Sequence, residues 1–352
     1  MGVPQLSERE RRVLEAVVQT YVETAQPAGS KALAERFAFG ISSATIRSTM
    51  SDLEEKGFLF HPHASAGRIP TDVAYRVYVD SLIPVPSLPN DERRRLSARI
   101  ATGASAVEAI LHRAAQSLGI LTQELGIALG PRLDNSVLER IELIRVSAER
   151  LLVALTLTRG AVRTIFVDVK GEIADAAILE VTAVLNERLA GLSLREIAIS
   201  LGERLRDTSA GRDATELLNV FVEEGDQVFD SSPDGQAVLL GQASVLAEQP
   251  EFASVDSMRK LVALTETREK LADLLRRRSH TAGLSITIGM EHEDPGLANF
   301  TVVTAPYHAG PLTGVIGVIG PTRMPYDKVI SLVKHTSDLV NDLLKESPRA
   351  HG

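Results

Sequence analysis

The apolar positions near the N-terminus recur at helical spacing. In the segment Leu6–Thr24 they fall on one side of a predicted helix, with polar residues on the other. Ser7 and Glu10 have the spacing of a capping box, in which each side chain bonds the backbone N–H of the other residue. The run Pro27-Ala28-Gly29 then breaks the chain, and a second, shorter helix is expected over Lys31–Ala38.

A third predicted helix, Ser43–Lys56, separates an apolar stripe from a polar one. Ile46, Met50 and Leu53 lie at positions i, i+4 and i+7, which is the spacing of a buried face. Gly57 is a suitable residue to end the helix. The other side of the helix carries short hydroxyls and one guanidinium, all crowded toward the N-terminal half. These candidate DNA-binding residues are Ser42, Ser43, Thr45, Arg47, Ser48 and Ser51.

After the third helix the pattern changes from helical to extended. Residues 58–70 predict two short strands joined by a loop of small residues, and Thr71 can cap a further helix. Gly67 in the loop would let the backbone approach a phosphate closely. His61 and His63 also raise the possibility of a metal site, but the hairpin offers no other metal ligand, so none is expected. The candidate DNA-binding residues of this hairpin are His61, His63, Ser65 and Arg68.

The distribution of charge along the chain matters more for DNA binding than the net charge does. The 352 residues carry a formal net charge of −8, which by itself argues against a nucleic-acid partner. DNA responds to the local surface, however, and no acidic residue occurs over Arg36–Ser51 or over Lys56–Thr71. A recognition helix enters the major groove with its N-terminal residues nearest the bases, where Arg47 could pair with a guanine. We therefore predict a winged helix-turn-helix DNA-binding domain over residues 1–83.

The rest of the chain predicts an α+β fold. A Pro-rich linker is expected over residues 84–90, followed by a domain in two pieces, 91–171 and 233–345, with a helical insertion at 172–232. The sequence order of the body is helices, strands, helices again, and then strands with a closing helix. The expected helical segments are Asp91–Gly126, residues 172–232, Asp256–Arg278 and a helix opened by Pro325; the expected strands are Val137–Ser147, Leu151–Thr158, Val162–Val169, Leu284–Gly289, Phe300–Ala305 and Gly314–Ile319.

Several classes of function find no support in the sequence. The chain has no cysteine, which excludes disulfides, thiolate zinc sites and thiol catalysis. No apolar run is long enough for a membrane span, and the first residues lack the apolar core of a signal peptide, so a soluble cytoplasmic protein is expected. The glycines of Gly314–Gly320 alternate with Val and Ile as in a strand, unlike a dinucleotide-binding loop. The acidic run Glu291–Asp294 is expected to be a solvated turn, and no enzyme, metal or cofactor is predicted.

Three segments carry a resemblance to a known family. LSERERRVLEAVVQTYVETAQPAGSKALAE, SSATIRSTMSDLEEKGFLFHPHASAGRIPTDVAYRVYVD and GVIGVIGPTRMPYDKVI closely resemble the HrcA family of heat-inducible transcription repressors. The resemblance implies a winged helix, a GAF-like domain, and a dimerisation domain inserted into the GAF-like domain. It also implies repression of chaperone operons through double-stranded DNA with an inverted-repeat operator, bound by a homodimer whose active form the GroEL chaperonin promotes. The alternative is a DeoR-like or GAF-type repressor that responds to a small-molecule ligand.

Overall fold

The structure is a computed structural model, and it falls into two compact units. The first unit comprises Met1–Leu129, Val238–Tyr307 and Val315–Asp342; the second comprises Gly130–Ala237, His308–Gly314 and Leu343–Gly352. Each unit is described by itself. The residues described are 5–63, 66–82, 88–101, 107–131, 133, 136–158, 161–169, 171, 173–206, 211–229, 238–266, 268–279, 281–309 and 312–346.

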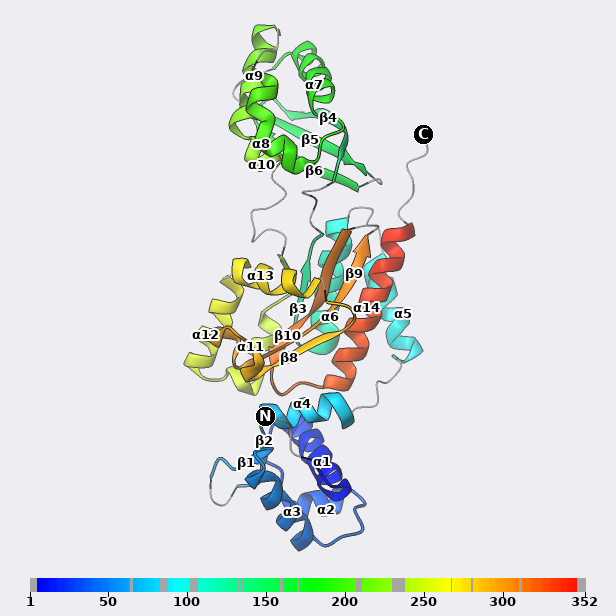
Figure 1. Ribbon diagram of the computed structural model, residues 1–352, viewed down its shortest axis with the longest axis vertical. Coiled ribbons are helices and arrows are strands. Elements are labelled where there is room, and N and C mark those ends of the chain that lie inside the picture. Colours follow the sequence, from blue (N-terminus) through cyan, green and yellow to red (C-terminus); the bar gives the residue numbers. More distant parts are fainter. Residues whose placement is uncertain are drawn as a thin grey trace. The chain divides into compact units, whose positions relative to one another are not determined.

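The first unit begins with three helices, a short hairpin and a fourth helix, which together we call the N-terminal subdomain (Figure 1). Its predicted elements are confirmed with small shifts at their ends. They are α1 (Glu8–Thr24), α2 (Ser30–Arg36), α3 (Ser43–Glu55), β1 (Leu59–Phe60), β2 (Ile69–Pro70) and α4 (Asp72–Val77), which continues as the π-helix η1 (Tyr78–Leu82). The capping box of Ser7 and Glu10 is present at the start of α1.

A small apolar core holds the N-terminal subdomain together. The stripe predicted on α3 is buried against the apolar side of α1, because both helices turn their periodic apolar positions inward. The fully buried side chains include Val13, Leu14, Val17, Val18, Leu33, Ile46, Leu53 and Phe58. The polar side of α3 is consequently left outside this core.

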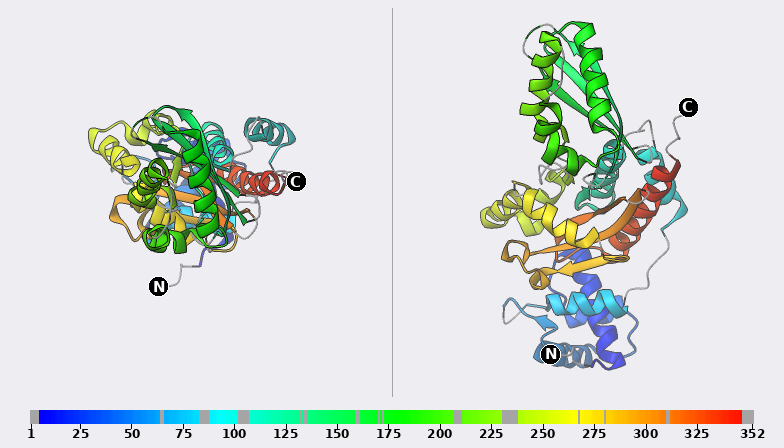
Figure 2. Two further views of the ribbon diagram at one scale, coloured as in Figure 1. Left: turned by 90° about the horizontal axis from the view of Figure 1, so that it is seen from above. Right: turned by 45° about the horizontal axis from the view of Figure 1, so that its top comes forward.

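The remainder of the first unit is built on a five-stranded sheet with the strand order β7-β3-β10-β9-β8. Strand β3 (Leu125–Leu129) pairs antiparallel with β10 (Leu312–Pro321) on one side and with β7 (Val238–Leu240) on the other. Helices α14 (Tyr326–Glu346) and α13 (Arg268–Ser279) lie on opposite sides of the sheet (Figures 1 and 2). The other elements are α5 (Asn90–Ala101), α6 (Val107–Thr122), α11 (Ser244–Ala247), η3 (Pro250–Phe252), α12 (Val255–Glu266), β8 (Ser285–Ile288), η4 (Gly289–Glu291), η5 (Pro295–Leu297) and β9 (Phe300–Ala309).

Glycines let the central strands approach their neighbours. A Cβ on Gly126 of β3 would lie 1.8 Å from the carbonyl oxygen of Ala115 in α6. A Cβ on Gly317 of β10 would lie 2.1 Å from the carbonyl oxygen of Val303 in β9. Gly317 therefore serves the packing of a strand, as its alternation with Val and Ile predicted, and does not open a helix.

The second unit packs three strands against helices. Strands β4 (Leu138–Ser147), β5 (Arg150–Leu157) and β6 (Ala161–Asp168) form an antiparallel sheet in that order. One face of this sheet shares a single apolar core with α7 (Asp175–Leu189), α8 (Leu194–Leu205), α9 (Arg212–Glu223) and α10 (Gly225–Phe229). Figure 1 shows these helices gathered beside the strands.

The body departs from the sequence expectations in three places. Helical structure was expected as far as Gly126, but α6 ends at Thr122 and the buried strand β3 follows. The strands β4, β5 and β6 were assigned to the interrupted domain, yet they share a core with the helices of the insertion, so that the compact unit begins at Gly130 and not at residue 172. The helix expected over Asp256–Arg278 is divided into α12 and α13.

Candidate nucleic-acid interface

The outward side of α3 is the most distinctive polar surface of the N-terminal subdomain. Ser43, Arg47, Ser48 and Ser51 are exposed, whereas Ile46 and Met50 on the other side of the helix are buried. The exposed set lies within the first nine residues of the helix, as the sequence predicted. The structure therefore brings these four candidate residues together on one open face.

Two further candidate hydroxyls are occupied in capping the helix. The Ser42 Oγ accepts a hydrogen bond from the backbone N–H of Thr45 at 3.1 Å and lies 2.9 Å from the Thr45 Oγ1. This cap holds the N-terminus of α3, where the free N–H groups and the helix dipole favour an anion. Ser42 itself remains exposed and Thr45 is half-buried.

Arg47 differs from the other arginines near α3. Arg36 pairs with Glu23 at 2.5 Å, and the Arg12 Nη2 donates to the carbonyl oxygen of Ala38 at 3.3 Å. Arg47 makes no ion pair or hydrogen bond with any residue that the structure describes. Lys31, at the start of α2, is likewise exposed and unpaired within the described part of the chain, and the sequence analysis did not single it out. Its position near the start of the predicted second helix was the sequence feature that could have identified it as a candidate DNA-binding residue.

The hairpin is tied to α3 by one carboxylate. The Glu54 Oε2 binds the Arg68 Nη2 at 2.8 Å, and the Glu54 Oε1 binds the His61 Nδ1. The Arg68 side chain is only 21% exposed, so two candidate residues of the hairpin are engaged with α3. His63 is exposed, and its carbonyl oxygen accepts the N–H of Ala66 at 2.8 Å. Ser65 lies outside the described residues.

The backbone of Arg68 also anchors the hairpin to the turn before α2. The Arg68 N–H donates to the carbonyl oxygen of Ala28 at 2.9 Å, and the N–H of Ala28 donates back to Arg68 at the same distance. A Cβ on Gly67 would lie 2.4 Å from that carbonyl oxygen, so the pairing requires glycine. Gly67 thus permits a close approach of the chain to itself, whereas the sequence suggested an approach to phosphate.

A partly buried ion pair joins the start of α1 to the end of α3. The Lys56 Nζ lies 2.6 Å from the Glu10 Oε1, and Glu10 is almost completely buried. The hydrogen bond from Lys56, followed by that from the Ser7 N–H, lowers the pKa of Glu10 to about 2. The capping box and the ion pair therefore share the Glu10 carboxylate, which fixes the end of α3 against the start of α1.

The described residues contain no group of three or more His, Asp or Glu side chains that could hold a metal ion. None of the helices within these ranges is long and apolar enough to cross a membrane.

Comparison with known proteins decides the family. Residues 108–330 match the family model for the HrcA protein C terminal domain. A heat-inducible transcription repressor HrcA from Chlorobium phaeobacteroides (strain BS1) is 38% identical over 349 residues, covering 96% of this chain and 98% of the relative. The chain belongs to the HrcA family. A second HrcA, from Geobacter sulfurreducens, is 36% identical over 342 residues and covers 97% of this chain and 98% of its own.

Membership of the HrcA family confirms the resemblance that the sequence motifs indicated. This is a family of heat-inducible transcription repressors and not of enzymes. A crystal structure described as a hypothetical protein superimposes on this HrcA-family chain with a TM-score of 0.70 at 22% identity, covering 98% of this chain and 100% of that one. At that level of identity the likeness supports the fold alone.

Replacing Glu54 with Gln should loosen the hairpin. The change keeps the shape of the side chain but removes the charge that binds Arg68 and His61, at a cost of about 1 kcal/mol for a partly exposed pair. Amide exchange at Ala28 and Arg68 should then accelerate by about 5-fold. Glu55→Gln, on the exposed neighbour of Glu54, is the control. Equal exchange in the two variants would show that Glu54 does not hold the hairpin.

Proposed function

We propose that this chain represses heat-shock genes by binding an inverted-repeat DNA operator through a winged helix-turn-helix. In this proposal α2 and α3 are the helix-turn-helix and the β1–β2 hairpin is the wing. The observation that carries the proposal is the open polar face of α3, on which Arg47 has no partner among the described residues. A helix with one buried stripe and short hydroxyls opposite it can enter the major groove without a steric barrier.

The candidate residues take different roles in this proposal. Arg47, Ser48 and Ser51 face the base edges, because Arg can bond guanine O6 and N7 together and hydroxyls adapt to several bases. Ser42, Ser43 and Thr45 present the helix N-terminus to a phosphate. In the wing, His63 and Ser65 approach the backbone of the DNA. His61 and Arg68, both bound to Glu54, act chiefly by orienting the wing.

Removing the guanidinium of Arg47 should weaken operator binding selectively. Loss of one bidentate base contact costs about 1–3 kcal/mol, so Arg47→Ala should lose affinity for the operator while binding to unrelated DNA changes little. Titrations of both DNAs by gel shift would measure the difference. Arg9→Ala, at an exposed position on α1, is the matched control. Unchanged operator affinity for Arg47→Ala, with a normal circular dichroism spectrum, would disprove the assignment.

We further propose that Gly130–Ala237 is the dimerisation domain and that the five-stranded domain is GAF-like. An inverted repeat requires two-fold symmetry, and the three-stranded sheet offers a suitable surface. Its outer face carries Ile144, Val146, Val162 and Phe166, which are between 47% and 60% exposed. Ile144, Leu152 and Phe166 are directly paired across the three strands and form an apolar row. Exposed apolar clusters of this kind mark association surfaces.

Placing a charge on this row should dissociate the dimer. Phe166→Asp would bury a carboxylate in an apolar interface and should weaken dimerisation by about 100-fold or more. Sedimentation over a range of protein concentrations would measure the change. Leu179→Asp is the control, because Leu179 is an exposed apolar residue of α7 in the helical layer of the same unit. A dimer that survives Phe166→Asp would exclude this face.

The chaperonin GroEL is the proposed regulator. The topology supports this proposal, because β3 must pair with strands that lie more than a hundred residues further along the chain. Pairing of strands so distant in sequence makes folding slow and leaves apolar surface exposed in the meantime. Such a chain is a natural chaperonin substrate, and its active fraction would then report how much chaperonin is free.

Addition of GroEL and ATP to the purified protein should raise the fraction that binds the operator. A denatured competitor protein should cancel this gain, because both proteins compete for the same chaperonin. The competent fraction can be titrated with operator DNA in excess. A fraction that is already complete without GroEL, and that simply falls on warming, would contradict chaperonin control.

A further inference from the structure

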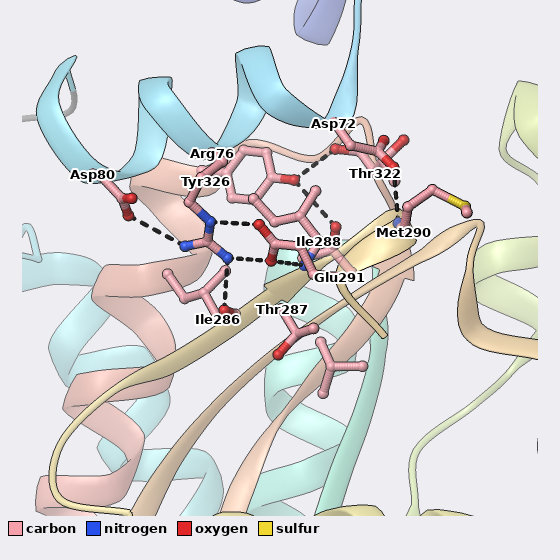
Figure 3. A network of polar contacts seen from close by, with 12 residues as sticks. Asp72, Arg76, Asp80, Ile286, Thr287, Ile288, Met290, Glu291, Thr322 and Tyr326 are labelled. Atoms are coloured by element: carbon pink, nitrogen blue, oxygen red, sulfur yellow. Dashed lines mark hydrogen bonds and ion pairs between the residues drawn. The ribbon is translucent and has the colours of Figure 1, made fainter. Parts of the chain in front are cut away.

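Arg76 of helix α4 binds the N-terminal subdomain to the five-stranded domain. The Arg76 Nε donates to the Glu291 Oε1 at 2.7 Å, and the Arg76 Nη2 donates to the Glu291 Oε2 at 2.5 Å (Figure 3). The same Nη2 donates to the carbonyl oxygen of Ile286 in β8 at 2.8 Å, and Asp80 accepts from Nη1 at 3.2 Å. A two-point pairing of this kind fixes direction as well as distance.

Glu291 is also oriented by a hydrogen bond within its own domain. The backbone N–H of Ile288 donates to the Glu291 Oε2 at 2.8 Å, as Figure 3 shows. Burial opposes ionisation of Glu291, but the hydrogen bonds from Arg76 and Ile288 outweigh it and lower the pKa of the carboxyl. The carboxylate is therefore charged and pre-oriented at neutral pH.

A second contact from α4 depends on a glycine. The Asp72 Oδ2 accepts the N–H of Met290 at 2.9 Å. Gly289 has a φ of +51°, and a Cβ there would lie 2.0 Å from the Asp72 Oδ2. Because no other residue would leave that space open, the η4 turn is shaped to receive the start of α4.

In a third contact the arginine belongs to the five-stranded domain and the acceptor belongs to α1. The Arg323 Nη1 donates to the carbonyl oxygen of Val22 at 2.7 Å, while Glu251 binds the Nε and, at 3.0 Å, the Nη2 of the same guanidinium. The rings of Tyr75 in α4 and Tyr326 at the start of α14 are also buried against each other, with their centroids 5.7 Å apart. The N-terminal subdomain is thus bound to the five-stranded domain by three polar contacts and one aromatic contact.

We propose that Arg76 and Glu291 are positioning residues for simultaneous binding of both operator halves. We call the contacts of Asp72, Arg76 and Arg323 with their partners the latch. The latch holds the N-terminal subdomain in one orientation on the five-stranded domain while the polar face of α3 stays exposed. The inference rests on the proposed dimeric DNA binding.

The latch should raise the affinity for an operator with two half-sites but not the affinity for an isolated half-site. A dimer that binds an inverted repeat gains affinity because the first contact holds the second winged helix near its half-site. If the winged helix can turn freely on its own body, ordering it reduces that gain. Binding of one winged helix to an isolated half-site has no such requirement.

The first test compares full and half operators in the intact protein. Arg76→Gln and Glu291→Gln should each weaken binding to the inverted repeat by about 10-fold and change half-site affinity by less than about 2-fold. The double variant should be no worse than either single variant, because all three break the same contact. Glu293→Gln is the control, since Glu293 lies two residues beyond Glu291 and only pairs with Arg277 on the surface at 3.1 Å.

Two outcomes would overturn the proposal in this test. Unchanged affinity for the inverted repeat would show that the contact does not position the winged helix. An equal loss at the half-site would show that the contact only supports the fold of the subdomain. If the unmodified protein binds one half-site as tightly as two, the proposed dimeric function fails, and the latch loses its role with it.

The second test needs no DNA and so separates the latch from the proposed function. Because the chain has no cysteine, a Glu35→Cys change on α2 gives a single site for a fluorescent label. Fluorescence anisotropy decay should report slow tumbling with the latch intact. A fast component should appear in Arg76→Gln/Glu291→Gln/Arg323→Gln. Its absence from the triple variant would overturn the latch.

Discussion

The five-stranded sheet can close only when strands far apart in the chain meet. Strand β3 occupies an inner position, between β7 on one side and β10 on the other. All of Gly130–Ala237 lies between β3 and β7 in the sequence and belongs to the other compact unit. The close approaches at Gly126 and Gly317 leave no room for an imperfect fit, because each would bring a Cβ within about 2 Å of a carbonyl oxygen. These contacts therefore restrict the strands to one register.

The surface that receives the N-terminal subdomain depends on this closure. Glu291 and Arg323 both follow the β7 strand in the sequence, whereas their partners Arg76 and Val22 precede β3. Glu251, which binds Arg323, follows β7 as well. The core of the N-terminal subdomain is local and can form as soon as its own helices are made. Docking must wait for residues that are made last. In our proposal, ordered DNA binding by both subunits therefore reports that the body has folded, which is the property a chaperonin-controlled repressor needs.

The sequence predicted what depends on local periodicity. The capping box at Ser7, the apolar stripe of α3 and the three strands β4, β5 and β6 were all foreseen, because each is determined by residues a few positions apart. The domain boundary was not, because periodicity identifies a strand but not the surface on which it packs. Strand β3 was missed because all five of its residues are buried, so that no alternation marks it.

In the candidate site, too, the sequence predicted local features but not contacts between distant residues. The exposed residues of α3 follow from the helical repeat, and the structure leaves them exposed. Glu291 was expected in a solvated turn, since nothing local indicates that its partner Arg76 lies 215 positions away. The contact of Arg68 with phosphate stays a prediction, but its ion pair with Glu54, which belongs to a different element, was not foreseen. Ion pairs between residues of different elements cannot be predicted from the periodicity of a single sequence.

These ion pairs also bear on how strongly one N-terminal subdomain would bind DNA in our proposal. Arg36, Lys56 and Arg68 are all paired with carboxylates of the same subdomain, so these three cations are not free to meet phosphate. Affinity that depends on phosphate contacts scales with the number of free cations, and on α2 and α3 these are Lys31 and Arg47. Two subdomains acting together add their contacts to one operator only if both are held in register. In our proposal, the paired cations near α3, the apolar outer face of β4, β5 and β6, and the latch on α4 meet this single requirement.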